Sequence, residues 1–317
     1  MTNLVPEPGH IPVLMEQVLQ SIRPNTGEVF VDCTAGRGGH ASAIAERIGP
    51  SGTVVLFDLD VTNLTYASAR VKAESGITPI AVHGSFTSVS RELEARSLRA
   101  DLVLADLGFA SNQMDDPMRG MSFSQDAPLD MRLDPSKGQT AAQLLERLSE
   151  RDLAEIIQQL GEEPFARRIA LKIVELRART PINSTTQLAD LVREAYGSRA
   201  RTSRMHPATR TFMALRIAVN DELGALRAFL EQVGVAAKRA YEGAPSWMNL
   251  GARVAVIGFH SLEDRMVKRQ FVDLSQRSIF RLEGKQPMVA SDAELAANPR
   301  ARSAKLRAAT VGRPDGR

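Results

Sequence analysis

The chain has 317 residues, of which 43% are hydrophobic and 24% are charged, with a formal net charge of +3 and a pI near 9.2. This composition is typical of a globular protein of about two domains, and it excludes an intramolecular disulfide because Cys33 is the single cysteine. The first residues lack the pattern of a signal peptide, and no apolar run reaches membrane-spanning length, so we expect a cytoplasmic protein without a membrane partner.

The first hundred residues alternate between strand and helix signals. Short β-branched, apolar runs occupy 28–32, 53–58, 77–82 and 101–106, and helical patterns separate them. This alternation predicts a doubly wound, mostly parallel, Rossmann-like α/β sheet. The carboxyl ends of parallel strands line the ligand crevice. We therefore expect residues 36–40, Asp58 and Asp106 on one edge of the sheet.

The loop DCTAGRGGHA at 32–41 follows the first strand and allows two interpretations. Its glycine spacing fits the G-x-G-x-x-G/A pattern of a dinucleotide site. Asp32, however, stands at the strand end, where a carboxylate suits the cationic amino group of S-adenosylmethionine and would repel a pyrophosphate. A second acid at the next strand end, Asp58, suits ribose hydroxyls in both interpretations. The loop alone favours the methyl donor without deciding the question.

The pattern becomes helical over residues 111–214. Ser149 and Ser184 stand at N-cap positions, and a long helix is expected from Pro207 to about Val233. No strand signal appears in this stretch, so we interpret it as an all-helical insertion. The sheet is expected to resume at 253–259.

Two segments near the end of the chain carry further expectations. Ser261 and Asp264 have the spacing of a capping box that begins a helix. Residues 300–317 are strongly basic, with one acid, and we expect them to be disordered until they meet a partner.

Several residues outside the glycine loop are candidates for chemistry. Asp106 ends the fourth strand, and His260 follows the fifth; either side chain faces the reacting atoms in one interpretation and has a purely structural role, as a cap or loop residue, in the other. The stretch 195–220 contains five arginines and no acid, a composition that favours phosphate binding over a solvated helix face. The five histidines lie far apart, so no metal is expected. Cys33 lies inside the loop, which excludes it as the nucleophile that methylation of cytosine at C5 requires.

These stretches together resemble the bacterial 16S ribosomal RNA (cytosine-N4)-methyltransferases. The resemblance extends from HIPVLMEQVL at 10–19 to NPRARSAKLR at 298–307, and HPATRTF and FHSLEDR are its most specific motifs. It implies a class I methyltransferase sheet formed by 1–110 and 215–317, with 111–214 as a helical RNA-recognition insertion. It also decides the loop in favour of S-adenosylmethionine as methyl donor.

The resemblance implies the positions that hold the donor, whereas the catalytic and RNA-binding candidates are hypotheses from the residues themselves. The donor positions are Gly38, Gly39, His40, Asp58, Phe86, Asp106 and Gln113. Asp106 and His260 are the catalytic candidates. The RNA-binding candidates are Phe109, Arg199, Arg201, Arg204, His206, Arg210, Arg302 and Lys305.

The implied reaction is methylation of the exocyclic N4 amine of a cytosine in 16S rRNA of the small ribosomal subunit. The loop after the fourth strand departs from the family, which usually has Val, Ser and Pro where this chain has Phe109, Ala110 and Asn112. Gly258 also replaces a common Ser. The alternative is therefore an assembly factor that binds the small subunit and methylates weakly or not at all. The sequence leaves a homodimer open.

Overall fold

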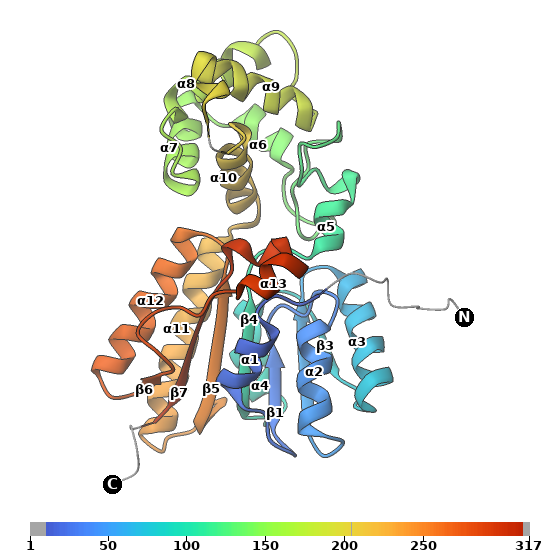
Figure 1. Ribbon diagram of the computed structural model, residues 1–317, viewed down its shortest axis with the longest axis vertical. Coiled ribbons are helices and arrows are strands. Elements are labelled where there is room, and N and C mark those ends of the chain that lie inside the picture. The colour runs from blue at the N-terminus through green and yellow to red at the C-terminus, as the bar shows by residue number, and fades with distance from the viewer. Residues whose placement is uncertain (1–10, 204, 313–317) are drawn as a thin grey trace. The chain divides into compact units, whose positions relative to one another are not determined.

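The computed structural model describes residues 11–203 and 205–312, with the side chain of Ser111 excepted. The chain divides into two compact units (Figure 1). Unit 1 combines the segment up to Gly108 with the segment from Leu223 onward, and unit 2 runs from Phe109 to Glu222. Among the described residues, no helix has both the length and the apolar character needed to cross a membrane.

Unit 1 contains a seven-stranded sheet in the order β3-β2-β1-β4-β5-β7-β6. The strands are β1 Val29–Asp32, β2 Thr53–Asp58, β3 Ile80–His83, β4 Ala100–Asp106, β5 Met248–Gly258, β6 Phe280–Leu282 and β7 Lys305–Val311. The first five strands pair in parallel, and β7 pairs antiparallel with both β5 and β6. The predicted doubly wound, mostly parallel sheet is confirmed.

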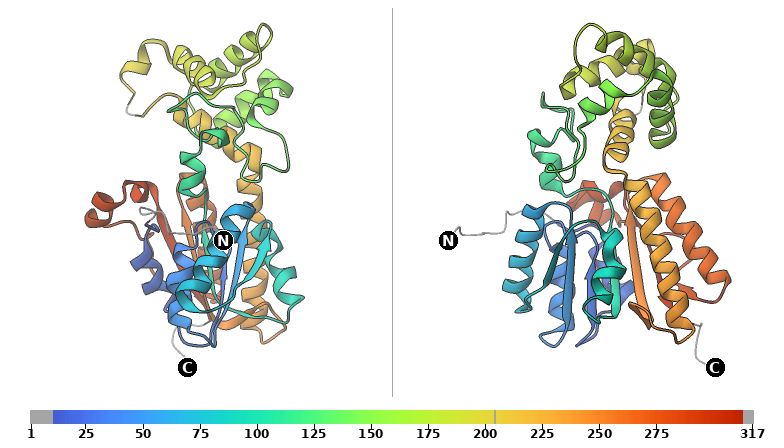
Figure 2. Two further views of the ribbon diagram at one scale, coloured as in Figure 1. Left: turned by 90° about the vertical axis from the view of Figure 1, so that its right-hand side faces the viewer. Right: turned by 180° about the vertical axis from the view of Figure 1, so that it is seen from behind.

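Helices cover both faces of this sheet (Figures 1 and 2). They are α1 Met15–Ile22, α2 Gly39–Ile48, α3 Val61–Ser75, α4 Val89–Glu94, α11 Glu222–Tyr241, α12 Ser261–Gln276 and α13 Asp292–Ala297. Alternate strand residues point to opposite faces. Thus Val31 packs in the core beneath α4, α11 and α12, whereas Phe30 packs with α1, α2 and α3.

Unit 2 is helical. Its helices are α5 Ser111–Asp115, α6 Ala141–Arg147, α7 Glu150–Gly161, α8 Ala166–Arg177, α9 Thr185–Tyr196 and α10 Ala208–Asn220. Ser149 and Ser184 cap α7 and α9 as predicted, accepting hydrogen bonds from the backbone N–H of Asp152 and of Gln187.

Two expectations for this region were wrong. The helix expected over 207–233 is interrupted at Asp221, whose left-handed backbone (φ 48°) ends α10 before α11 begins. The boundary expected at 214 falls inside α10, which packs on α7 and α9 and so stays with unit 2 up to Glu222.

The basic C-terminal segment is also more ordered than expected. Residues Pro299–Ser303 form a short 3-10 helix, and β7 then pairs antiparallel with residues 253–258 of β5. The expectation of disorder over 300–317 was wrong up to residue 312, because alternating side chains of β7 such as Leu306 are fully buried in the core. Residues 313–317 lie outside the described part of the chain.

Candidate functional site

The carboxyl edge of the parallel strands holds the glycine loop. The strand order reverses between β1 and β4, so the topological switch point lies between Asp32 and Asp106. Ligands of doubly wound sheets bind in the crevice at this point. Thr34 connects the two strand ends, because its hydroxyl accepts a hydrogen bond from the Asp106 backbone N–H at 2.6 Å.

Hydrogen bonds hold the loop in an open turn. The Asp32 carboxylate accepts from the Thr34 N–H at 3.0 Å, and the Asp58 carboxylate accepts from the Gly36 N–H at 2.7 Å. Gly36 and Gly38 both have left-handed backbone conformations, with φ of 50° and 71°. Glycine adopts this region without the steric cost that a side chain brings.

Gly38 and Gly39 are also required by space. A Cβ atom on Gly38 would lie 2.9 Å from the Cα of Ala67, and one on Gly39 would lie 2.3 Å from the Pro12 ring. Both contacts are closer than real Cβ atoms allow. The two glycines therefore let α2 begin close against α3 and the segment before α1.

Three carboxylates gather along this edge, and none of them has an ion pair with a lysine or arginine among the described residues. Burial raises the pKa of Asp32 to about 7 and that of Asp58 to about 6, although backbone hydrogen bonds oppose both shifts. Burial raises the pKa of Asp106 well above its usual value, and the charges of Asp32 and Glu263 add to this shift. The edge therefore favours a cationic ligand and opposes a pyrophosphate.

Asp106 offers the clearest sign of a missing partner. Its Oδ1 is buried and has no hydrogen-bond partner among the described residues. Its Oδ2 lies 3.7 Å from Nδ1 of His40, whose Nε2 is 2.9 Å from the Val13 carbonyl oxygen. A buried oxygen without a partner is costly. The site therefore fits a ligand that brings a donor or a positive charge to Asp106.

Two other predicted residues belong to the same edge in different ways. Phe86 begins a short 3-10 helix just beyond β3, and its ring packs edge-on against Phe229 of α11 with centroids 5.4 Å apart. Cys33 is buried, and burial raises the pKa of its thiol well above the usual value. Cys33 is thus unsuited to be a thiolate nucleophile.

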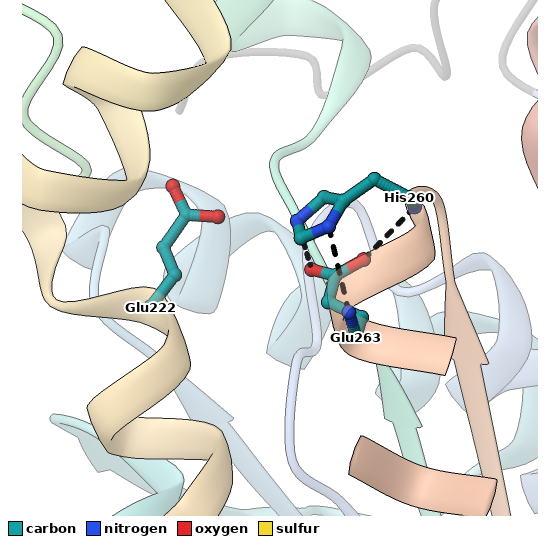
Figure 3. Close-up of side chains that lie close together, drawn as sticks. All are labelled: Glu222, His260 and Glu263. Atoms are coloured by element: carbon teal, nitrogen blue, oxygen red, sulfur yellow. Dashed lines mark hydrogen bonds and ion pairs between the residues drawn. The ribbon is translucent and has the colours of Figure 1, made fainter. Parts of the chain in front are cut away.

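His260 caps α12, which corrects the predicted cap (Figure 3). The capping box is formed by His260 and Glu263, one residue before the predicted Ser261 and Asp264, so that expectation was wrong. Glu263 accepts from the backbone N–H of Phe259 at 2.8 Å and of His260 at 3.3 Å. The helix begins one residue earlier than predicted because an imidazole nitrogen can accept the hydrogen bond from the N3 backbone N–H, as a serine hydroxyl does.

The His260 ring retains an unused nitrogen. Its Nδ1 is 3.5 Å from the Glu263 backbone nitrogen, and its Nε2 is 3.3 Å from Glu263 Oε1. The side chain is only 8% exposed, yet Nε2 has no hydrogen bond of acceptable geometry among the described residues. A buried nitrogen without a hydrogen bond is the kind of group that a polar ligand at the end of β5 would satisfy.

In unit 2, two predicted residues follow directly from β4. Gln113 is buried, and its side-chain oxygen accepts from the Ala110 N–H at 3.0 Å, which stabilises the first turn of α5. The half-buried ring of Phe109 lies under the guanidinium of Arg216, with 4.7 Å between the ring centroid and Cζ.

The predicted RNA-binding residues of unit 2 differ in availability. Arg199 and Arg201 are exposed, and the Arg199 guanidinium lies 5.3 Å from the ring centre of Phe165. His206 is exposed and stacks on Phe123 with centroids 4.5 Å apart. Arg210 is half-buried and donates to the Glu162 carbonyl oxygen. Arg204 lies outside the described residues.

The two predicted RNA-binding residues of unit 1 lie where β7 begins, next to the end of β5. Lys305 pairs in register with Gly258, and its Nζ is 3.7 Å from the Asp264 carboxylate. Arg302 is exposed in the preceding 3-10 helix. Both cations therefore lie on the same edge of the sheet as the glycine loop.

Sequence reasoning missed three parts of this region. Thr34 joins β1 to β4, Glu263 fixes His260, and Arg216 covers Phe109. Only Glu263 had a usable local signal, its position three residues after a possible N-cap. The other two contacts join segments far apart in the sequence.

The chain matches the model of the MraW methylase family over residues 7–311. A protein named ribosomal RNA small subunit methyltransferase H from a Cyanothece species is 45% identical over 309 residues, which cover 97% of this chain and 96% of that protein. A protein of the same name from Syntrophotalea carbinolica is 44% identical over 315 residues, covering 94% and 96%.

Solved structures give a more distant comparison. An rRNA methylase from Streptococcus thermophilus is 10% identical, covers 94% of this chain and 94% of its own, and has a TM-score of 0.40.

Proposed function

We propose, since the chain belongs to the MraW methylase family and is an S-adenosylmethionine-dependent methyltransferase, that it methylates the exocyclic N4 amine of a cytosine in 16S rRNA. The relatives named above are rRNA small subunit methyltransferases, which supports the substrate class. The choice of N4 rests on the motifs of the cytosine-N4 family and on the chemistry of Cys33, which leaves no thiolate for attack at C5.

One observation carries the donor assignment. Asp32, Asp58 and Asp106 converge on a glycine loop at the switch point, and Asp106 keeps a buried oxygen without a partner. S-adenosylmethionine has a cationic amino group for Asp32 and ribose hydroxyls for Asp58. Its sulfonium charge suits an edge that holds three carboxylates. Gly38, Gly39, His40, Phe86 and Gln113 are proposed as its further contacts.

The proposed reaction is a direct displacement. The N4 nitrogen attacks the methyl carbon, the carbon–sulfur bond breaks, and the amine loses one proton, which gives N4-methylcytidine and S-adenosylhomocysteine. The lone pair of N4 is delocalised into the ring, so the site must hold the amine in line with the methyl group. Asp106 is the group proposed to accept a hydrogen bond from N4.

The target base must leave its stack to reach the crevice. We propose that Phe109 stacks on the extruded cytosine and that Nε2 of His260 contacts its polar edge. Exposed arginines of both units, among them Arg199, Arg201 and Arg302, are proposed to hold phosphates of the surrounding RNA.

The decisive experiment uses purified protein, S-adenosylmethionine with a labelled methyl group, and small subunits from cells that lack the enzyme. The RNA is digested and the labelled nucleoside is identified by mass spectrometry. Labelled N4-methylcytidine is the expected product. Label on another nucleoside contradicts the target atom. No label, with donor binding shown by calorimetry, would favour the alternative of an assembly factor that binds the small subunit.

A further inference from the structure

We propose that Arg216 and Glu222 form a brace that holds the Phe109 ring in place as the stacking surface for the target base. This inference rests on the function proposed above and adds two positioning residues to it. Neither residue is proposed to touch the donor or the reacting amine.

The brace begins with an ion pair of fixed geometry. Arg216, near the end of α10, donates from Nε to Glu222 Oε1 at 2.7 Å and from Nη2 to Oε2 at 2.8 Å. The two side chains are only 15% and 10% exposed. A bidentate pair of this kind fixes the plane of the guanidinium, not only its position. Figure 3 shows Glu222 at the first turn of α11.

The plane fixed in this way covers one side of Phe109. The guanidinium carbon lies 4.7 Å from the ring centroid, within the range of a cation–π contact. Phe109 is partly exposed rather than buried in the core. An aromatic ring held on one side by a guanidinium offers the flat, preorganised surface on which a base stacks.

The position of Phe109 places this surface near the chemistry. Phe109 is three residues after Asp106, so their Cα atoms are at most about 11 Å apart. Gly108 between them has φ of 102°, a backbone turn that residues with side chains rarely adopt. The chain therefore turns after β4, and only Leu107 and Gly108 separate Phe109 from the Asp106 end of that strand.

The brace also changes how the arginine-rich stretch is understood. Arg216 belongs to the acid-free run that favoured phosphate binding, yet Glu222 lies just beyond that run and pairs with it. A guanidinium whose Nε and Nη2 are both used by a carboxylate, and whose face is against a ring, is poorly placed for a phosphate. Its position instead suits the orientation of Phe109.

The test is a double-mutant cycle on the labelled-methyl reaction with small subunits. Phe109→Val removes the ring, Arg216→Lys keeps the charge opposite Glu222 but removes the planar stack, and the third variant combines both. We expect Phe109→Val to raise KM for subunits roughly 5- to 50-fold, the loss of one stacked base. Arg216→Lys is expected to raise KM about 3- to 10-fold, and the double variant to match Phe109→Val alone.

Controls separate positioning from folding. Phe109→Tyr keeps the aromatic ring, so its KM for subunits should stay close to that of the unchanged protein, in contrast to Phe109→Val. Arg193→Lys changes an exposed arginine of α9 that pairs with Asp190, and it should leave KM unchanged. The affinity for S-adenosylhomocysteine, measured by calorimetry, should stay within about twofold in every variant, because the brace is not proposed to touch the donor.

The possible failures are distinguishable. The brace is wrong if Arg216→Lys raises KM by the same factor in the Phe109→Val variant as in the unchanged protein. It is also wrong if Arg216→Lys lowers thermal stability without raising KM. In both cases the proposed function stands. If the unchanged protein makes no N4-methylcytidine, the proposed function itself fails.

Discussion

Asp32, proposed to bind the amino group of the donor, lowers the stability of the folded protein as pH rises. Its pKa is about 7 in the folded protein and near 3.8 without burial. The folded state therefore holds more protons than the unfolded state between these values, so this group makes the protein less stable as pH rises from about 4 to 7. Asp58, with a pKa of about 6, acts in the same direction.

Asp32→Asn is expected to stabilise the free protein at pH 8 and to weaken the donor. One pKa unit corresponds to about 1.4 kcal/mol, and burial of the amide offsets part of the gain, so we expect roughly 1–3 kcal/mol from denaturant unfolding. The gain should disappear below about pH 3, where Asp32 is protonated in both states. Calorimetry should show at least a tenfold loss of affinity for S-adenosylmethionine. Unchanged affinity would exclude Asp32 from the site.

His260 combines capping with the proposed base contact, and two substitutions separate them. Asparagine is a good N-cap and alanine is not. His260→Asn should therefore change the free energy of unfolding by less than about 0.5 kcal/mol, whereas His260→Ala should lower it by about 1 kcal/mol. If Nε2 contacts the cytosine, both variants lower kcat/KM about tenfold or more. Full activity of the asparagine variant would reduce His260 to a helix cap.

At the scale of elements, local signals predicted what local interactions determine. The parallel strands were predicted because each is a short apolar run. The three strands next to the crevice, β1, β2 and β4, also end in an aspartate. The strands β6 and β7 at the edge of the sheet were missed because pairing stabilises them: β7 pairs with β5, and β6 pairs with β7. Lys305 and Arg307 gave the segment a basic composition, but both contact Asp264 of α12. That partner lies more than 40 residues earlier in the chain, so no short window of sequence reveals it.

The break between α10 and α11 is a second case of structure without a local signal. Asp221 adopts a left-handed conformation, with φ 48° and ψ 41°. Glycine or asparagine usually occupies such a position, and their absence here removed the sequence signal for a helix end. Asp221→Gly should relieve this strain and change the free energy of unfolding by at most about 1 kcal/mol. Asp221→Val should cost about 1–2 kcal/mol, because β-branched residues avoid this region. Equal stability of the two variants would contradict a strained break.

The candidate site was predictable at the carboxyl edge of the sheet and less so elsewhere. Topology brings strand ends together, so Asp58 and Asp106 could be assigned to one edge from sequence. The Arg216 contact with Phe109 and the bond from Asp106 to Thr34 join distant segments, and neither has a motif.

At the scale of the whole molecule, the net charge is too small to explain binding to a polyanion. The charge is +3 for 317 residues, so attraction must come from local clusters. Arg201 of unit 2 and Arg302 of unit 1 are exposed, and among the described residues neither has an ion pair. Each is free to neutralise one phosphate.

Replacing these arginines should reduce the salt dependence of RNA binding in steps. Each phosphate contact adds about 0.7–0.9 to the slope of log affinity against log salt. Arg201→Gln and Arg302→Gln should therefore each lower the slope by about one, and the double variant by about two, since the two residues belong to different units. Arg239→Gln, on the exposed side of α11, is the matched control. If all three single variants give the same slope, the predicted phosphate contacts are wrong, and if only Arg302→Gln lowers it, unit 2 recognises RNA by stacking instead.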